Sequence, residues 1–408
     1  MNILFLTQIL PFPQNSGPKV KTWNVIRYLC QHGHRITLVS FVRPEEMKYI
    51  SALQGICQVV HAVPIYRSRI ADIGYVVRSY LTNRPFLIER DDLQPMQQIV
   101  DKLVKEGEFD FIHADQLTMV QFAIRGASAL PHKKPKVIFD AHNAVWTIVE
   151  RMKENALWIL KPVLAMEAKR VKQYEGELLK TVDHVLAVTD IDRECLENAF
   201  RSSKLQEYDR ISPITVIPIA VDTQKLQPVN RKVGSKNIVT LGTLYYPPNA
   251  DGIRWFFNEV FPLVLKLVPD ATLTIIGKDP PQDFIEMAER NASTIRVTGY
   301  VPELTPYLEQ SALMVVPVRA GGGMRVRILE AFAYAMPVVT TTIGLEGIQA
   351  TLNRDVFVAD TSMEFANSII RLLENDSLQN QLSRNGRILA ETKYDWQAVL
   401  KHMDIIYQ

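Results

Sequence analysis

The sequence predicts an α/β fold with two Rossmann-like domains, one after the other in the chain. Short runs of β-branched residues alternate with longer amphipathic stretches, which is the pattern of a parallel sheet covered by helices on both faces. These runs fall into two sets. The chain has 408 residues, enough for two domains that each bury a core of their own.

The two sets of expected strands are separated by a polar segment. In the first half the strands are Ile3 to Thr7, Ile36 to Phe41, Phe111 to Ala114, Val137 to Asp140, Val185 to Thr189 and Thr215 to Ile219. In the second half they are Ile238 to Leu241, Thr272 to Ile276, Ile295 to Thr298, Leu313 to Pro317, Val338 to Thr341 and Val356 to Val358. The segment Val221 to Asn237 lacks an apolar period and is the expected linker. We therefore expect domains over residues 1–225 and 226–391, followed by an amphipathic helix over 392–408.

The composition argues against several classes of protein. With 46 basic and 44 acidic side chains the formal net charge is +2, so the chain lacks the basic excess of a nucleic-acid binder. Cys30, Cys57 and Cys195 are too scattered for a disulfide framework or a zinc site, and we expect reduced core residues in the cytoplasm. The apolar N-terminus runs into two prolines and is expected to be a buried strand, not a signal. No stretch approaches the roughly 20 apolar residues of a membrane span, so any membrane contact would be peripheral, at the inner face.

The segment VVPVRAGGGMRVRILEAFAYAMPVVTT combines a strand, three glycines, a helix start and another strand. The glycines let the backbone approach a ligand closely, and a helix start offers free N–H groups and roughly half a positive charge. Arg325, in the expected first turn, can clamp phosphate oxygens, and Arg327 adds a second charge. A diphosphate could thus be held without a metal. No Gly-Lys-Ser/Thr follows, so this is not an ATP-binding Walker loop.

This segment resembles the donor-binding segment of family 4 glycosyltransferases. The likeness extends from PFPQNSG to the terminal helix that contains Trp396. It implies a GT-B fold, with the two domains facing a central cleft and the C-terminal helix crossing back to the N-terminal domain. It also implies that Glu330 accepts hydrogen bonds from the ribose of the donor. The family usually has a second glutamate where this chain has Gly322, which puts in question how the transferred sugar is held.

The resemblance extends to other loops that would bind the donor. It places Gly17 against the donor phosphates and the acceptor, and Gly242 and Asn249 in a second phosphate-holding loop. Backbone groups near Tyr300 and Val301 would recognise the base. A simple turn, a helix N-cap and a strand-to-helix turn are the alternatives for these loops. The complete set of expected donor-binding residues is Gly17, Gly242, Asn249, Tyr300, Val301, Gly321, Gly322, Gly323, Met324 and Glu330.

Polar residues at strand ends in the first half are expected on the acceptor side. The resemblance implies that His142 hydrogen-bonds the transferred sugar, and His142, Arg325 and Arg327 are the expected catalytic residues. Two further strand ends contribute expected contacts to the acceptor, namely His113, Asp115, Asp140 and Asn143. A structural histidine and strand capping are the alternatives.

A metal site is not expected. Asp190 and Asp192 resemble the metal-binding Asp-x-Asp of a different transferase fold, but Asp190 is expected to be a helix N-cap instead.

Family 4 enzymes transfer a sugar with retention, which here would use a UDP- or GDP-linked donor and no further cofactor. The acceptor would be a glycan, a lipid or a small molecule, in the context of cell-surface polysaccharide biosynthesis. Two alternatives stay open: a nucleotide-sugar-binding subunit without turnover, which Gly322 favours, and a sugar-nucleotide 2-epimerase. The stretch YRSRIADIGYVVRSYLTNRPFLIER mixes arginines with tyrosines and aliphatic residues, as an interfacial surface would, with a solvated helix as the alternative.

Overall fold

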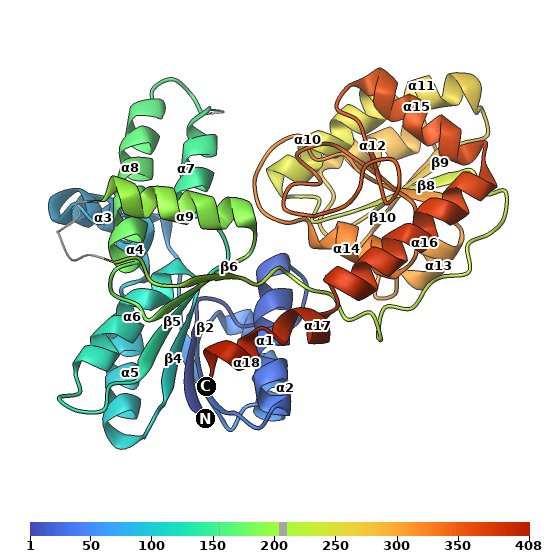
Figure 1. The fold of residues 1–408 in the computed structure, drawn as a ribbon. Helices are drawn as coiled ribbons and strands as arrows, with labels where there is room; N and C mark the ends of the chain where they lie inside the picture. The colour runs from blue at the N-terminus through green and yellow to red at the C-terminus, as the bar shows by residue number, and fades with distance from the viewer. Residues whose placement is uncertain (155, 204–209) are drawn as a thin grey trace. The chain divides into compact units, whose positions relative to one another are not determined.

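The structure is a computed structural model that describes residues 1–154, 156–203 and 210–408. It divides into two compact units, each with its own parallel sheet and helices on both faces of that sheet (Figure 1). Unit 1 comprises Met1–Ile219 together with Leu400–Gln408, and unit 2 comprises Ala220–Val399. The division therefore falls after Ile219, where the sequence placed it after residue 225.

The sheet of unit 1 has strand order β3-β2-β1-β4-β5-β6-β7, and all neighbours are parallel. The strands are β1 Asn2–Thr7, β2 Arg35–Val42, β3 Val59–Pro64, β4 Phe111–Asp115, β5 Lys136–Ala141, β6 His184–Ala187 and β7 Ile214–Val216. The sequence did not predict β3. This strand lies at the sheet edge and is mostly half-buried, so it lacks the apolar run that marks the buried strands.

Helices cover both faces of this sheet (Figure 1). The helices of unit 1 are α1 Gly17–Gln31, α2 Ile50–Gln54, α3 Arg69–Thr82, α4 Phe86–Asp91, α5 Gln94–Glu106, α6 Leu117–Ser128, α7 Val145–Glu154, α8 Lys161–Leu178, α9 Asp190–Ser202 and α18 Met403–Ile406, with a 3-10 turn at Pro44–Tyr49. Helices α1 and α18 lie side by side, and Tyr28 Oη donates to Asp404 Oδ1 at 3.0 Å.

The sheet of unit 2 has strand order β10-β9-β8-β11-β12-β13, also entirely parallel. Its strands lie where the sequence predicted them: β8 Asn237–Leu241, β9 Thr272–Ile276, β10 Ile295–Gly299, β11 Leu313–Val316, β12 Val338–Thr340 and β13 Phe357–Val358. Its helices are α10 Pro247–Trp255, α11 Phe261–Leu267, α12 Gln282–Arg290, α13 Thr305–Glu309, α14 Val326–Ala333, α15 Ser362–Leu373 and α16 Asp376–Lys393, with a π-helical turn at Phe256–Val260.

The C-terminal segment returns to unit 1, as expected, but not as one helix. Helix α17, Trp396–Leu400, and helix α18 are separate, and α16 ends at Lys393. The break is fixed locally. Asp395 forms a parallel bridge with Val221, and its carboxylate accepts bonds from the Oγ1 of Thr223 at 2.6 Å and the N–H of Gln397 at 3.0 Å. These partners hold residues up to Val399 in unit 2, whereas Tyr407 is buried in unit 1.

Both sheets share one topological feature that positions the candidate site. In each, the first strand lies between the second and the fourth, so the direction of the crossovers reverses between β1 and β4 and again between β8 and β11. Loops at the carboxyl ends of strands diverge at such a switch point and form the usual ligand site of open α/β sheets. Each unit therefore offers one site of this kind.

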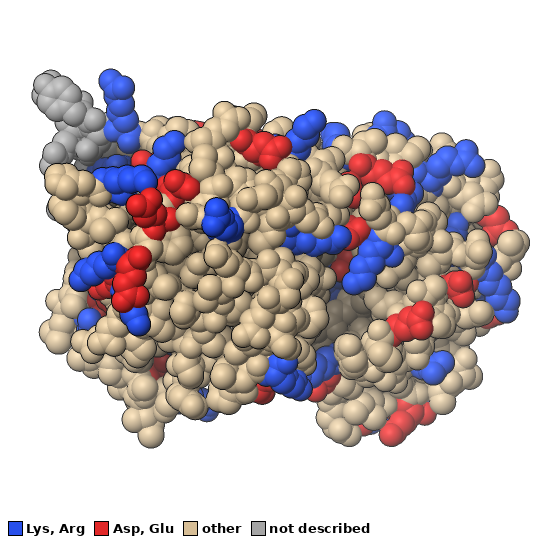
Figure 2. Space-filling view, turned by 90° about the horizontal axis from the view of Figure 1, so that it is seen from below, with Lys and Arg blue, Asp and Glu red and all other residues tan. Residues whose placement is uncertain are grey.

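Two features bear on the expected surface properties. Among the described residues, no helix combines the length and the apolar character that crossing a bilayer requires. Figure 2 shows basic and acidic side chains interspersed on the face in view, where the described residues form no continuous basic field.

Candidate active site

The glycine segment of unit 2 forms the loop between β11 and α14, at the switch point. Gly321 has φ 91° and Gly323 has φ 86°, a left-handed conformation that residues with a side chain rarely adopt. Helix α14 begins at Val326, so Arg325 is the N-cap residue and does not lie in the first turn as predicted. Its guanidinium folds back over the loop and donates to the carbonyls of Gly322 at 2.5 Å and Gly323 at 2.9 Å. Arg325 therefore holds the loop in shape.

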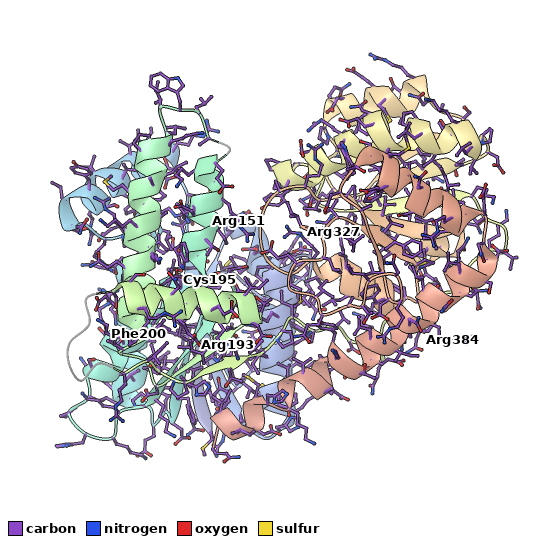
Figure 3. The ribbon with its side chains drawn as sticks, turned by 45° about the horizontal axis from the view of Figure 1, so that its top comes forward. Arg151, Arg193, Cys195, Phe200, Arg327 and Arg384 are labelled. Carbon is purple, nitrogen blue, oxygen red and sulfur yellow. The ribbon has the colours of Figure 1, made fainter. Side chains whose placement is uncertain are left out.

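Arg327, which is labelled in Figure 3, bonds to groups on both sides of this switch point. Its Nη1 donates to the carbonyl of Leu241, the last residue of β8, at 2.7 Å, and its Nη2 donates to Asn249 Oδ1 on α10 at 2.5 Å. Asn249 in turn donates to the carbonyl of Thr243 at 3.1 Å. Burial, and then the charge of Arg325, lowers the pKa of Arg327 to about 10, so the side chain stays cationic at neutral pH. In this structure Arg327 and Asn249 bind protein groups and shape the loops.

Three glycines allow the loops to approach this closely. A Cβ on Gly242 would lie 2.7 Å from Nη1 of Arg327. A Cβ on Gly277, which follows β9, would lie 1.9 Å from the carbonyl oxygen of Gly242, and one on Gly252 equally close, 1.9 Å, to that of Pro317. The sequence did not single out Gly252 or Gly277. Gly277 does follow directly on an apolar strand, and this is the signal that could have identified it.

The remaining expected donor residues lie in several parts of the two units. Glu330 is half-buried on α14, where burial raises its pKa and the charge of Arg327 opposes that rise. Met324 is buried beside the loop glycines. Tyr300 and Val301 follow β10, two strands from β8, and Tyr300 is largely exposed. In unit 1, Gly17 opens α1 and is partly buried.

Unit 1 places a cluster of charged side chains at its own switch point. His142 follows β5, and its Nε2 lies 2.8 Å from Asp115 Oδ1 at the end of β4. The hydroxyl of Thr22 donates to both oxygens of Asp115, at 3.0 and 3.1 Å. Because a carboxylate only accepts, Nε2 carries a proton, and in the neutral ring Nδ1 would be the acceptor. No described residue bonds that Nδ1.

A second buried ion pair interacts electrostatically with His142. Lys21 on α1 donates to Asp140 on β5, and the two side chains are 2% and 0% exposed. Burial alone would raise the pKa of Asp140, but the charge of Lys21, together with bonding and charge from His113 and His142, holds that pKa below its usual range. The carboxylate is therefore ionised and compensated inside the unit.

His113 belongs to the same cluster. Its ring stacks on Phe5 with centroids 4.0 Å apart, its Nδ1 lies 2.5 Å from Tyr407 Oη, and its Nε2 lies 3.5 Å from Asp140 Oδ2. Burial, and then the charges of Asp140 and Asp115, raises the pKa of Tyr407 well above its usual value. The sequence predicted that the C-terminus would dock but did not identify Tyr407 as the residue that reaches this cluster.

Burial bears on the expected roles of three residues. His113, Asp115 and Asp140 are fully buried, because their strands are central in the sheet and α1 covers them. In this structure Asp115 bonds His142, Asp140 pairs with Lys21, and none of the three side chains is exposed. Asn143 is half-buried in the loop after His142.

One ligand atom from each of His113, Asp115 and Asp140 lies within 4.8 Å of the others, close enough for a cation. The ammonium of Lys21 already supplies positive charge there.

Asp190 is also not the N-cap that was predicted. Thr189 is the N-cap of α9 and accepts a bond from the N–H of Asp192 at 3.0 Å, while Asp192 accepts one from Ala144 at 3.1 Å. Asp190 is the first residue of the helix and pairs with Arg193 at 3.0 Å.

Comparison with known families gives both units a match. The family model described as Glycosyltransferase Family 4 matches residues 16–225, just over half of the chain. The chain belongs to glycosyltransferase family 4. The model described as Glycosyl transferases group 1 matches residues 235–375, which include the glycine loop and α14. The protein is thus a family 4 glycosyltransferase of the GT-B type, as the sequence predicted.

Individual proteins are similar to this family 4 glycosyltransferase at low identity. An uncharacterized 44.6 kDa protein in the cps region of Klebsiella pneumoniae is 28% identical over 165 residues, a match that spans 39% of this chain and 42% of that protein. Sucrose-phosphate synthase from Thermosynechococcus elongatus is 14% identical with a TM-score of 0.71, covering 100% of this chain and 98% of that one. Anabaena HepE in complex with UDP is 15% identical with a TM-score of 0.67, covering 100% and 99%. These two structures share the fold.

Proposed function

We propose that this glycosyltransferase moves a hexose from a uridine diphosphate donor to an acceptor hydroxyl, with retention and without a bound metal or cofactor. The observation that carries the proposal is the loop with left-handed glycines that leads into α14 at a topological switch point. Anabaena HepE is described in complex with UDP and with UDP-glucose, which favours uridine over guanosine.

The diphosphate would bind at the start of α14. The first N–H groups of a helix have no partner within it, and they carry partial positive charge toward an anion. Arg325 lies at this end, and its bonds to backbone carbonyls include those to Gly322, Gly323 and Ala320. Charge-assisted bonds to phosphate oxygens are about twice as strong as neutral ones, so the guanidinium would exchange carbonyls for phosphate. Arg327 would keep the loops after β8 and β11 in position and add positive charge.

The other donor contacts follow from position. Glu330 would accept bonds from the ribose hydroxyls, and backbone groups of Tyr300 and Val301 would bind the base. In unit 1 the free Nδ1 of His142 would accept a bond from a hydroxyl of the transferred sugar, while Asp115 holds the ring in the required tautomer.

The chemistry needs positioning and charge stabilisation more than a protein nucleophile. The acceptor oxygen would attack the anomeric carbon from the face that the diphosphate leaves, forming one C–O bond as the other breaks. The departing phosphate oxygen would take the proton of the acceptor hydroxyl. Negative charge develops on the leaving group, where α14 and Arg325 would stabilise it.

Titration calorimetry tests the donor site. Native protein should bind UDP and UDP-glucose more tightly than GDP, and Arg325→Ala should lose roughly 10- to 100-fold in affinity, the effect of one or two charged bonds. Arg319→Ala is the matched control, because Arg319 lies on the same segment but packs over the ring of Trp255 at 5.3 Å. Equal losses in the two variants, or no binding of any nucleotide by native protein, would contradict the proposed site.

Hydrolysis of UDP-glucose tests mechanism without knowledge of the acceptor. Proton NMR of freshly released glucose should show the α anomer first, in the presence of EDTA as in its absence. Initial release of the β anomer would exclude retention, and loss of activity in EDTA would exclude metal independence. His142→Ala should slow release while leaving UDP affinity unchanged.

A second candidate is a binding subunit without turnover, which Gly322 favours because the family usually has a glutamate there. Tight binding of UDP-glucose with no sugar release or transfer to any glycan, lipid or small-molecule acceptor would support it over the first.

A further inference from the structure

Unit 1 exposes an unusual concentration of large apolar side chains. Of the 29 such side chains exposed among the described residues, 14 fall within residues 66–81 and 152–166. They are Tyr66, Ile70, Ile73, Val76, Val77, Tyr80, Leu81, Met152, Leu157, Trp158, Ile159, Leu160, Val163 and Met166. Monomeric proteins rarely expose large contiguous apolar patches without a binding role.

Helix α3 contributes the first half of this patch. Ile70, Ile73, Val77 and Tyr80 recur at helical spacing, so they form one stripe along the helix, and each is more than half exposed. Ser79 is the only buried residue of α3. The apolar stripe of this helix therefore faces outward, the reverse of a helix that packs onto a core.

The second half lies at the start of α8 and in the residues that precede it. Leu157 and Trp158 are 75% and 78% exposed and belong to the connection between α7 and α8. Figure 1 shows these two helices side by side. Val163 and Met166 continue the apolar surface along α8 at helical spacing. An exposed tryptophan flanked by leucine and isoleucine is typical of groups that enter the interface of a bilayer.

The two halves are joined by direct contacts. Arg170 lies one turn beyond Met166 on α8, with its guanidinium 5.5 Å from the ring centroid of Tyr80 and its Nε donating to Asn83 at 3.0 Å. The N–H of Phe86 donates to Glu167 at 2.6 Å. The exposed stripe of α3 therefore adjoins the face of α8 that leads to Trp158.

The charge around the patch identifies its partner. Residues 66–84 and 151–172 carry ten basic and three acidic side chains. Four of the basic ones, Arg67, Arg78, Arg84 and Lys153, pair with Glu89, Asp91, Asp92 and Glu150 just outside these segments, which leaves a local formal charge of +3 from ten basic and seven acidic side chains. A second copy of the protein on this patch would bring two such charges together. An anionic lipid surface instead attracts each basic side chain, and its acyl region accepts the apolar ones.

We propose that α3, the residues 156–160 and the start of α8 form a docking surface for an anionic lipid bilayer. Trp158 and Leu157 enter the interface between headgroups and acyl chains, and Lys161, Lys169 and Arg69 lie at headgroup level. The proposal does not depend on sugar transfer, because it concerns a surface outside the donor loop and the His142 cluster.

Flotation of the full chain with vesicles tests this surface without any nucleotide, so the result is separate from the test of activity. Native protein should float with vesicles of phosphatidylcholine that contain about 30% anionic phosphatidylglycerol. It should float much less with vesicles of phosphatidylcholine alone. Lys161→Glu should lower the partition coefficient roughly 30-fold, because it replaces a positive by a negative charge and so changes the charge near the lipid by two units. Arg384→Glu is the matched control: this exposed arginine lies on α16 in unit 2 (Figure 3).

The apolar contribution is tested by Trp158→Ser, with Val233→Ser, 86% exposed in unit 2, as its control. All four side chains are exposed, so the variants should fold. Equal flotation of native protein and both patch variants would overturn the proposal, as would equal binding to neutral vesicles. A native dimer that Trp158→Ser converts to a monomer, with no flotation of either, would assign the patch to self-association instead.

Discussion

Replacing Lys21 by methionine should destabilise unit 1 strongly. The ammonium of Lys21 compensates the carboxylate of Asp140, and both groups are almost fully buried. Methionine keeps the length of the side chain but leaves the carboxylate without its cation. Removing one partner of a buried ion pair costs about 3–5 kcal/mol, mainly because the remaining charge stays desolvated. His113, 3.5 Å away, can replace only part of the lost interaction.

The effect has a definite pH dependence. Lys21 holds the pKa of Asp140 low in the folded protein, so the pair stabilises the fold above the unfolded pKa, about 3.9, and that contribution disappears as the pH falls below it. In the variant, burial is opposed only by His113 and His142, so the pKa of Asp140 is higher than in native protein. The variant is therefore destabilised most at neutral and alkaline pH and least below about pH 4.

Hydrogen exchange measures the loss region by region. At pH 7 the amides of β5 should exchange roughly 150- to 5000-fold faster in Lys21→Met than in native protein, the equivalent of 3–5 kcal/mol. Lys19→Met is the control on the same helix, because its pair with Glu46 is partly exposed and should be worth less than about 1 kcal/mol. Adding Asp140→Asn to Lys21→Met should restore most of the protection. If the two single lysine variants exchange alike, or if the double variant stays as unstable as Lys21→Met, our account of this pair is incorrect.

Three further predictions address other parts of the molecule. Gly321→Ala should weaken UDP binding, because alanine at φ 91° is strained by about 1–2 kcal/mol, whereas Gly322→Ala, where φ is not positive, should bind nearly as native protein does in calorimetry. Arg327→Lys should lose one of the two bonds that the guanidinium donates to different loops, which lowers the free energy of unfolding of unit 2 by about 1–3 kcal/mol and its melting temperature with it. An unchanged melting temperature would show that the two bonds are not needed for stability. Burial raises the pKa of Glu175 to about 8, so stability should fall as the pH rises from about 4.5 through 8, and melting curves of Glu175→Gln should lack this slope.

The sequence alone identified the parts of the protein that depend on local pattern. Buried parallel strands appear as short apolar runs, so the strands of unit 2 and all of unit 1 except the edge strand β3 could be located. Three glycines followed by a helix start are equally local, and they led to the family before any contact was known. Where a strand ends and a glycine loop begins can be read from adjacent residues, because no distant partner determines it.

The tertiary structure decided which distant residues meet. Tyr407 bonds His113, 294 positions away, and Lys21 pairs with Asp140, 119 positions away, because the crossovers of a parallel sheet bring α1, β4, β5 and the C-terminus together. Arg327 likewise reaches Leu241, 86 positions away. For this reason three residues expected to contact the acceptor are instead fully buried. The end of α16 could not be predicted from the sequence either, because the bridge between Asp395 and the distant Val221 fixes it. Local patterns encode which elements form, whereas burial and charge pairing at the site depend on how those elements are stacked.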